Sequence, residues 1–165
     1  DINKSTKNVI SAAYYISINN YDEFIEQFEQ IFTKFNSVFL IGAFFTHMFS
    51  RFIDSYNKAV KEYDIAVKNS KNHIFDPEVS RKYVDTNKYK AIAKKLNEYI
   101  DWGLELVRNR TLLDFVYYYY KGNIAIEQNK KKAFEILKQL DGYYYESQEQ
   151  FEKIYDELAL EFKEK

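Results

Sequence analysis

The sequence contains no cysteine, a single proline and only four glycines in 165 residues. Without cysteine the chain can form no disulfide bond, no thiolate nucleophile and no cysteine-ligated metal site. This absence suits a reducing compartment, and we expect a cytoplasmic protein, although many exported proteins also lack cysteine. The scarcity of helix breakers, together with apolar residues at 3.6-residue spacing in most segments, predicts an all-α fold.

Long apolar runs are also missing. The longest, Val38–Phe45, is too short to span a bilayer and predicts a buried helix, so we expect no membrane partner. The chain begins at Asp1, with no methionine and no charged-then-apolar signal pattern. We therefore expect a trimmed protein or the later part of a longer one.

Residues for catalysis are sparse. The two histidines, His47 and His73, have no Glu-x-x-His or His-x-x-x-His partner, which excludes the known zinc and di-iron spacings. His47, in an apolar segment, is expected to lie in the core. No glycine-rich phosphate loop or serine-elbow motif occurs. We expect neither enzymatic activity nor a cofactor.

Aromatic residues are abundant instead, with 16 tyrosines and 14 phenylalanines, and they predict a largely aromatic core. With 46% hydrophobic and 30% charged residues, the composition is that of a globular protein. The length favours one domain spanning residues 1–165. Within it we predict two halves, 1–72 and 86–165, joined by a loop that contains Pro77.

Seven or eight helices are predicted, paired head to tail in a tetratricopeptide-like superhelical array or bundle. Asn20 or Asp22 is expected to cap the second helix, and Thr86 or Asn87 the helix that follows the loop. Gly42 is expected to permit the close crossing of another helix, and Gly103 to stop a helix or mark a bend. The predicted ranges are 4–17, 21–35, 38–52, 54–69, 88–102, 104–121, one from about 126, and 146–162, with an irregular connection over 70–86. Whether 54–69 continues the preceding helix is left open.

The helix boundaries of this prediction are worked out from the segment Leu112–Tyr145. Gly122 and Gly142 stand where two successive helices should end, because glycine tolerates the left-handed conformation beyond a helix. Lysines in a first turn oppose the helix dipole, so we place the start of the second helix near Ile126, before Lys130. The buried stripe of the last helix either caps the array or makes a two-fold contact. Its residues are Phe151, Ile154, Tyr155, Leu158 and Phe162.

Charge is distributed unevenly. Residues 81–138 carry 13 basic and 7 acidic groups, whereas residues 139–165 carry 3 and 8. One interpretation is solvated helix faces. The other is a basic middle that receives an anionic group or an acidic tail from a second subunit.

Two tyrosine runs, Tyr117–Tyr120 and Tyr143–Tyr145, are the most distinctive local features. Consecutive residues of a helix point in different directions, so some of these rings must lie inside and others at a surface. They either fill the core with their hydroxyls at its boundary or form an aromatic wall that grips a ligand. Tyr118 and Tyr119 are the candidates for such a wall. Nucleic acid is a poorer ligand, because neither an alternation of basic and aromatic residues nor a basic overall balance accompanies the rings.

Three segments together resemble the C-terminal regulatory domain of the Rgg/GadR/MutR family of Gram-positive transcription regulators. They are DEFIEQFEQIFTKFNSVFL, SRFIDSYNKAVKEYDIAVKNSKNHI and LLDFVYYYYKGN…KKAFEILKQLDGYY. The last is similar to that family's F-x-x-x-x-Y-x-x-G segment and its following helix ending in L-x-x-L-G. The resemblance covers roughly residues 20–160 and has no catalytic signature. It implies a tetratricopeptide-like domain that dimerises and holds a short linear pheromone peptide in a concave groove.

The family's DNA-binding helix-turn-helix would lie upstream, so this chain by itself is expected to sense a peptide and not to bind nucleic acid. The family's Arg and Asn peptide contacts match Arg51, Asn69 and Asn72 best. An Arg fork suits a carboxylate and an Asn amide suits an extended backbone. The alternative is a free-standing helical interaction protein, such as a spirochaete-type surface lipoprotein domain that binds a host protein, or a toxin-immunity protein.

Overall fold

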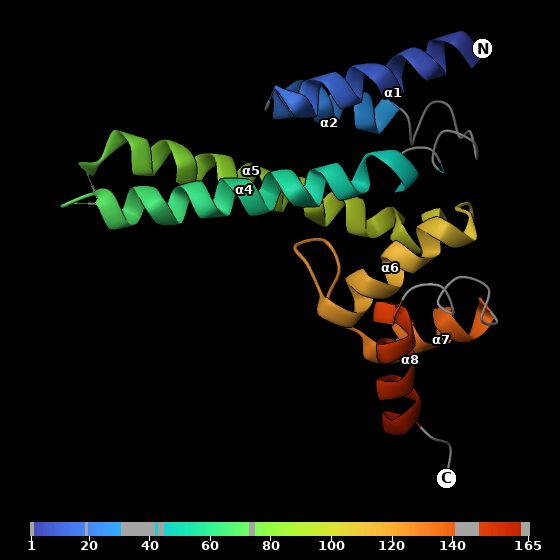
Figure 1. Ribbon diagram of the computed structural model, residues 1–165. Coiled ribbons are helices and arrows are strands. Elements are labelled where there is room, and N and C mark those ends of the chain that lie inside the picture. The colour runs from blue at the N-terminus through green and yellow to red at the C-terminus, as the bar shows by residue number, and fades with distance from the viewer. Residues whose placement is uncertain are drawn as a thin grey trace. The chain divides into compact units, whose positions relative to one another are not determined.

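The computed structural model describes residues 2–18, 20–30, 42, 45–72, 75–140 and 149–162 (Figure 1). Within these ranges the chain is helical and has no strand, so the predicted all-α fold is confirmed. Its helices pack as contacting pairs, α1 with α2, α4 with α5, α6 with α7, and α7 with α8. Their bounds are α1 Ile2–Ser17, α2 Tyr21–Glu29, α4 Phe49–Asn69, α5 Pro77–Leu104, α6 Asn109–Lys121, α7 Lys130–Gln139 and α8 Glu149–Glu161.

The chain forms two compact units, residues 1–106 and residues 107–165. The connection between the two predicted halves lies inside the first unit, between α4 and α5, and a single domain stays a prediction. Some predicted features fall outside the described residues. They are the stop at Gly142, the run Tyr143–Tyr145, His73, and the parts of the second and third helices within residues 31–41.

In the first unit, α1 and α2 form a helical hairpin. Asn20 caps α2, as expected, because its side-chain oxygen accepts the N–H of Glu23. The buried face of α1 contains Asn8, Ala12 and Ile16. Ile10 lies off that face and is 64% exposed, because the buried stripe follows i, i+4 steps from Asn8.

Among the described residues of this unit, the core mixes aromatic and aliphatic side chains, whereas a largely aromatic core was predicted. Phe24, Phe45, Phe49, Phe52 and Tyr89 are among its largest fully buried side chains. Phe49 to Asn69 is one helix, which answers whether 54–69 continues the preceding segment. It runs antiparallel to α5, and the two lie side by side (Figure 1).

His47 is exposed, contrary to its expected place in the core. Its neighbours Phe45, Met48 and Phe49 supply the buried face of this stretch, and His47 falls on the outer arc between them. The apolar neighbours of His47 are therefore buried, although His47 itself is exposed.

The start of α5 corrects the largest error of the sequence prediction. We expected irregular chain over residues 70–86, but Pro77 is the first residue of α5. Asp76 caps the helix, and its carboxylate accepts the N–H groups of Glu78 at 2.9 Å and Val79 at 3.3 Å. Proline suits this position because its missing N–H would be unsatisfied there in any case, and its fixed φ is already helical.

The expectation that Thr86 or Asn87 caps a helix was also wrong. Thr86 is buried inside α5, and its hydroxyl donates to the Lys82 carbonyl oxygen at 2.8 Å, one turn earlier. A threonine can satisfy its hydroxyl in this way in the middle of a helix, so it need not be a cap.

Both glycines of the first unit allow close packing. A Cβ added to Gly42 would lie 3.0 Å from the carbonyl oxygen of Leu106, so the expected close approach occurs, against the turn that follows α5. A Cβ on Gly103 would lie 2.5 Å from Cε2 of the Phe45 ring. Gly103 lies in the last turn of α5, which ends one residue later at Leu104, and it is buried beneath an aromatic ring.

In the second unit, α6 begins at Asn109 and not at residue 104 as predicted. The chain turns after α5, Arg108 is extended, and its carbonyl oxygen accepts the N–H groups of Thr111 and Leu112. The helix ends at Lys121, as expected, and Gly122 follows with φ +75°.

The second helix of this unit, α7, begins at Lys130, so our placement of its start near Ile126 was wrong. Asn123 closes the preceding turn by accepting the N–H groups of Ala125 and Ile126, both at 2.9 Å. Asn129 then caps the helix by accepting the N–H of Lys132 at 2.9 Å.

Lys130, which we expected to be excluded from this first turn, is tolerated there because carboxylates from α8 approach it. The ammonium of Lys130 lies 2.9 Å from Glu157 and 3.3 Å from Glu161. These carboxylates offset the unfavourable interaction of Lys130 with the helix dipole.

The predicted stripe of α8 is confirmed. Phe151, Ile154 and Leu158 are buried, and the rings of Tyr155 and Phe162 pack against Phe134 of α7 at centroid distances of 5.7 and 6.0 Å. The stripe thus covers α7 within its own unit.

Candidate functional site

Two neighbouring cavities form a groove between α4 and α5. Their volumes are about 310 and 240 Å³, and they share Glu62 and Lys82. The larger cavity, near the end of α1, is also lined by Ile16, Ser17, Ser55, Lys58, Ala59, Arg81, Asp85 and Tyr89. The smaller one, near the α4–α5 connection, is also lined by Ile65, Ala66, Asn69, Ser70, Asp76 and Glu78.

One stripe of α4 forms a wall of this groove. Its residues follow alternating steps of four and three, so they share one face of the helix. Arg51 and Asn69 are 18 residues apart, which is about five turns and roughly 27 Å. They therefore point the same way from opposite ends of the helix. The stripe consists of Arg51, Ser55, Lys58, Glu62, Ile65 and Asn69.

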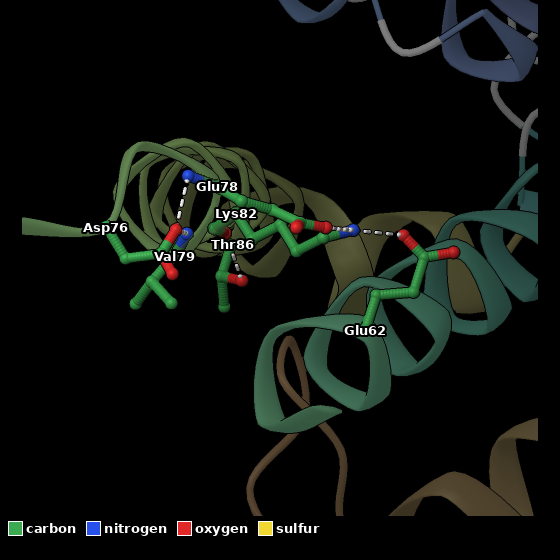
Figure 2. A network of polar contacts seen from close by, with 6 residues as sticks. All are labelled: Glu62, Asp76, Glu78, Val79, Lys82 and Thr86. Atoms are coloured by element: carbon green, nitrogen blue, oxygen red, sulfur yellow. Dashed lines mark hydrogen bonds and ion pairs between the residues drawn. The ribbon is translucent and has the colours of Figure 1, made fainter. Parts of the chain in front are cut away.

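Lys82 connects the two walls of the groove. As Figure 2 shows, its ammonium points from α5 toward α4 and lies 3.1 Å from Glu62. Glu78, one turn before Lys82 on α5, lies 3.9 Å from the same ammonium. Only 16% of the Lys82 side chain is exposed, so this ion pair is more shielded from solvent than a typical surface pair.

The backbone beside Lys82 is also well anchored. Asp76 closes the first turn of α5, and Thr86 bonds the Lys82 carbonyl one turn further on (Figure 2). A charged side chain held on a regular helix can present its atoms in a fixed geometry, as a binding site requires.

Apolar residues line the bottom of the larger cavity. Tyr89 is 1% exposed, and its ring contacts those of Phe52 and Tyr56 at 5.6 and 6.1 Å. Ile16 of α1 is buried beside the cavity. The groove therefore combines a packed apolar base with polar and charged walls.

The site residues predicted in the first unit lie along this groove to different degrees. Asn69 lines the smaller cavity. Arg51 is exposed and stands one turn beyond Ser55, the first lining residue of α4. Asn72 is exposed in the α4–α5 connection but lines neither cavity.

The two predicted tyrosines belong to the second unit. Tyr119 is 7% exposed, and the ammonium of Lys132 lies 4.8 Å from its ring centroid. Its carbonyl oxygen accepts the N–H of Asn129. Tyr118 is half-buried, with its ring 5.5 Å from that of Phe115. Tyr119 thus joins α6 to α7 and offers little surface to a ligand.

Tyr120 belongs to a polar cluster that joins α6, α7 and α8. Its hydroxyl donates to Glu157, and Lys130 lies 5.5 Å from its ring centroid. The hydrogen bond from Tyr120, followed by that from Lys130, lowers the pKa of Glu157. The same bond raises the pKa of Tyr120, and the bonds to Glu157 and Glu161 raise that of Lys130.

This cluster bears on the uneven charge of the sequence. Lys130 comes from the basic middle, and Glu157 and Glu161 come from the acidic end of the same chain. Part of the basic middle therefore meets the acidic tail within one unit, without a second subunit.

Several groove residues were not predicted from the sequence: Lys58, Glu62, Arg81 and Lys82. The 18-residue repeat of the helical wheel could have placed Lys58 and Glu62 on the line from Arg51 to Asn69. The contribution of α5 could not be found in that way, because the predicted irregular connection contained Arg81 and Lys82.

Among the residues that the structure describes, no three His, Asp or Glu side chains gather where they could hold a metal ion. No helix in these ranges combines the length and the apolar character needed to cross a bilayer. Comparisons with protein-family models, with curated proteins and with solved structures gave no match. What the groove binds is therefore inferred from its own residues.

Proposed function

We propose that this chain binds a short linear peptide in the groove between α4 and α5. The observation that carries the proposal is the arrangement of two adjoining cavities, which share Glu62 and Lys82 and lie along one stripe of α4. A site for a compact small molecule is usually a single concave and mostly apolar pocket. A long groove with polar walls fits an extended ligand better.

The dimensions suit a peptide. Arg51 and Asn69 are roughly 27 Å apart along the helix axis, a span that about eight extended residues cover. Peptide N–H and C=O groups need partners along their whole length, and the groove offers carboxylates, ammonium groups and the Asn69 amide. Alternate side chains of an extended peptide would face the apolar base at Ile16 and Tyr89.

The wider role that we propose is the sensing and dimerisation domain of a bacterial transcription regulator. It is supported by the resemblance of the three segments quoted above to the Rgg/GadR/MutR regulators, and in such a protein a separate helix-turn-helix would bind DNA. The net charge of −1 agrees with a chain that does not bind DNA by itself. Sedimentation of the isolated chain would test the dimer, and a monomer at high concentration would contradict it.

Calorimetric titration tests the peptide proposal. The ligand is a synthetic pool of octapeptides with Leu, Ile, Val and Phe at alternate positions. Arg51→Ala should weaken binding by about ten- to hundred-fold, because it removes a charge-assisted hydrogen bond. Arg51→Lys should restore only part of the affinity, because an ammonium lacks the fork of a guanidinium.

The matched control is Lys90→Ala, which removes an exposed cation nine residues beyond Arg81 on α5, on the opposite face of that helix. Its affinity should equal that of the wild type, and thermal melts of all three variants should coincide, since Arg51 and Lys90 are exposed. Unchanged affinity in Arg51→Ala would exclude Arg51 from the site. If no octapeptide binds the wild type, the proposal is wrong, and the helical interaction protein becomes the better hypothesis.

A further inference from the structure

Charge changes sign along the groove between α4 and α5. The cavity near α1 is lined by three cations and two anions, which are Lys58, Arg81, Lys82, Glu62 and Asp85. The cavity near the α4–α5 connection is lined by three anions and one cation, which are Glu62, Asp76, Glu78 and Lys82. We call these the basic end and the acidic end.

The helix dipoles do not cancel this difference. Because α4 and α5 are antiparallel, the negative C-terminus of α4 lies beside the positive N-terminus of α5 at the acidic end, and their partial charges offset each other (Figure 1). The charges of the side chains therefore decide the polarity of the groove.

Ion pairing within the groove increases the difference in free charge between its two ends. Lys82 is shared by both cavities and lies between Glu62 and Glu78, so it adds little free positive charge to either end. Lys58 and Arg81 form no ion pair with another residue that the structure describes, and both line the basic end. Arg51 lies about two turns beyond Lys58 on the same stripe of α4. The basic end thus keeps cations that a ligand can use.

We propose that the groove binds its peptide in one direction, with the C-terminal carboxylate at the basic end and the N-terminal ammonium at the acidic end. This inference rests on the proposed function. In this direction the carboxylate lies at the end of the groove that holds Arg51, Lys58 and Arg81, where these cations can make charge-assisted contacts with it. In the reverse direction it would enter a cavity lined by three carboxylates, two of which already lie beside the one ammonium, that of Lys82. These carboxylates would repel the carboxylate of the peptide, so the complex in the reverse direction is weaker.

The test uses the octapeptide pool described above in three forms: free at both ends, C-terminally amidated and N-terminally acetylated. Calorimetry measures each form against the wild type, Arg81→Gln and Glu78→Gln. The controls are Lys90→Gln and Glu98→Gln, which neutralise exposed residues on the opposite face of α5.

Amidation should weaken binding to the wild type about tenfold or more, since it removes a charge-assisted contact. Arg81→Gln should weaken the free peptides by a similar factor and leave the amidated peptides nearly unchanged. Acetylation should weaken binding in a way that depends on Glu78, so Glu78→Gln should remove its effect. The factor should be smaller, about two to five, because Glu78 already lies 3.9 Å from the Lys82 ammonium. The two control variants should bind all three forms like the wild type.

The opposite pairing, in which amidation couples to Glu78 and acetylation to Arg81, would show the reverse direction and overturn the inference. Binding that is insensitive to both end groups would overturn it too, while the proposed peptide-binding function would stand. If none of the three forms binds, the proposed function falls and the inference falls with it.

Discussion

Replacing Gly103 by alanine should destabilise the first unit, although alanine is the better helix former. Gly103 lies in the last turn of α5, and a Cβ built on it would be 2.5 Å from Cε2 and 3.0 Å from Cγ of Phe45. Carbon atoms in contact normally lie about 3.5–4.0 Å apart. Phe45 is 2% exposed, so its ring has no open space into which it could move.

Two opposing contributions set the size of the effect. Alanine in place of glycine inside a helix stabilises by about 1 kcal/mol. An added methyl group in a packed core costs about 1–3 kcal/mol, because neighbouring side chains must leave their preferred rotamers. A shift of about 1 Å in a rigid, buried ring belongs at the upper end of that range. We expect the free energy of unfolding to fall by about 1–2 kcal/mol.

Trp102 supplies the assay. It is the only tryptophan of the chain and stands next to Gly103, so its fluorescence follows the unfolding of the first unit in urea. The midpoint should fall while the slope with denaturant stays constant. Lys94→Ala, an exposed change on the same helix, is the control and should alter stability by no more than about 0.5 kcal/mol.

A double-mutant cycle with Phe45→Leu tests the cause. Removing part of the ring should relieve the clash, so Gly103→Ala should cost less in this background, with a coupling energy of about 1 kcal/mol or more. A Gly103→Ala protein as stable as the wild type would refute the packing argument. Strict additivity of the two changes would refute the role of Phe45.

Three further predictions concern turns and charges. Asp76→Ala should lower the free energy of unfolding by about 1 kcal/mol, because it removes the cap of α5. Asp76→Asn should keep most of this stabilisation, as urea titration would show. Gly122→Ala should cost about 1–3 kcal/mol in thermal melts, because φ +75° with ψ 157° is a conformation that only glycine adopts readily; an unchanged melting temperature would contradict it. The pKa of Glu157 is lowered in the folded protein, so its contribution to stability is present above its usual value of 4.5 and is lost as pH falls through the lower folded value. Glu157→Gln should flatten that part of the pH–melting profile, and an unaltered profile would count against the cluster with Tyr120 and Lys130.

Local sequence patterns determined the helices. Apolar spacing identified the buried stripe of α8, glycine marked the end of α6 at Gly122, and Asn20 was recognised as a cap. These features depend on residues within a few positions of each other, and such interactions can be inferred from the order of amino acids. The start of α5 could also have been inferred from neighbouring residues. Asp76 followed by Pro77 is a local signal for a helix start, and we treated the proline as a breaker instead.

Other features depend on contacts between distant residues, and only the tertiary structure decided them. Lys130 can begin α7 because Glu157 and Glu161 approach from α8, 27 and 31 residues later. The groove depends on the packing of α4 against α5, and the sequence shows no sign that Lys82 of α5 would pair with Glu62 of α4. Helical periodicity defines the faces of each helix, but the partner of each face is selected by packing, which sums many weak contacts over the whole unit.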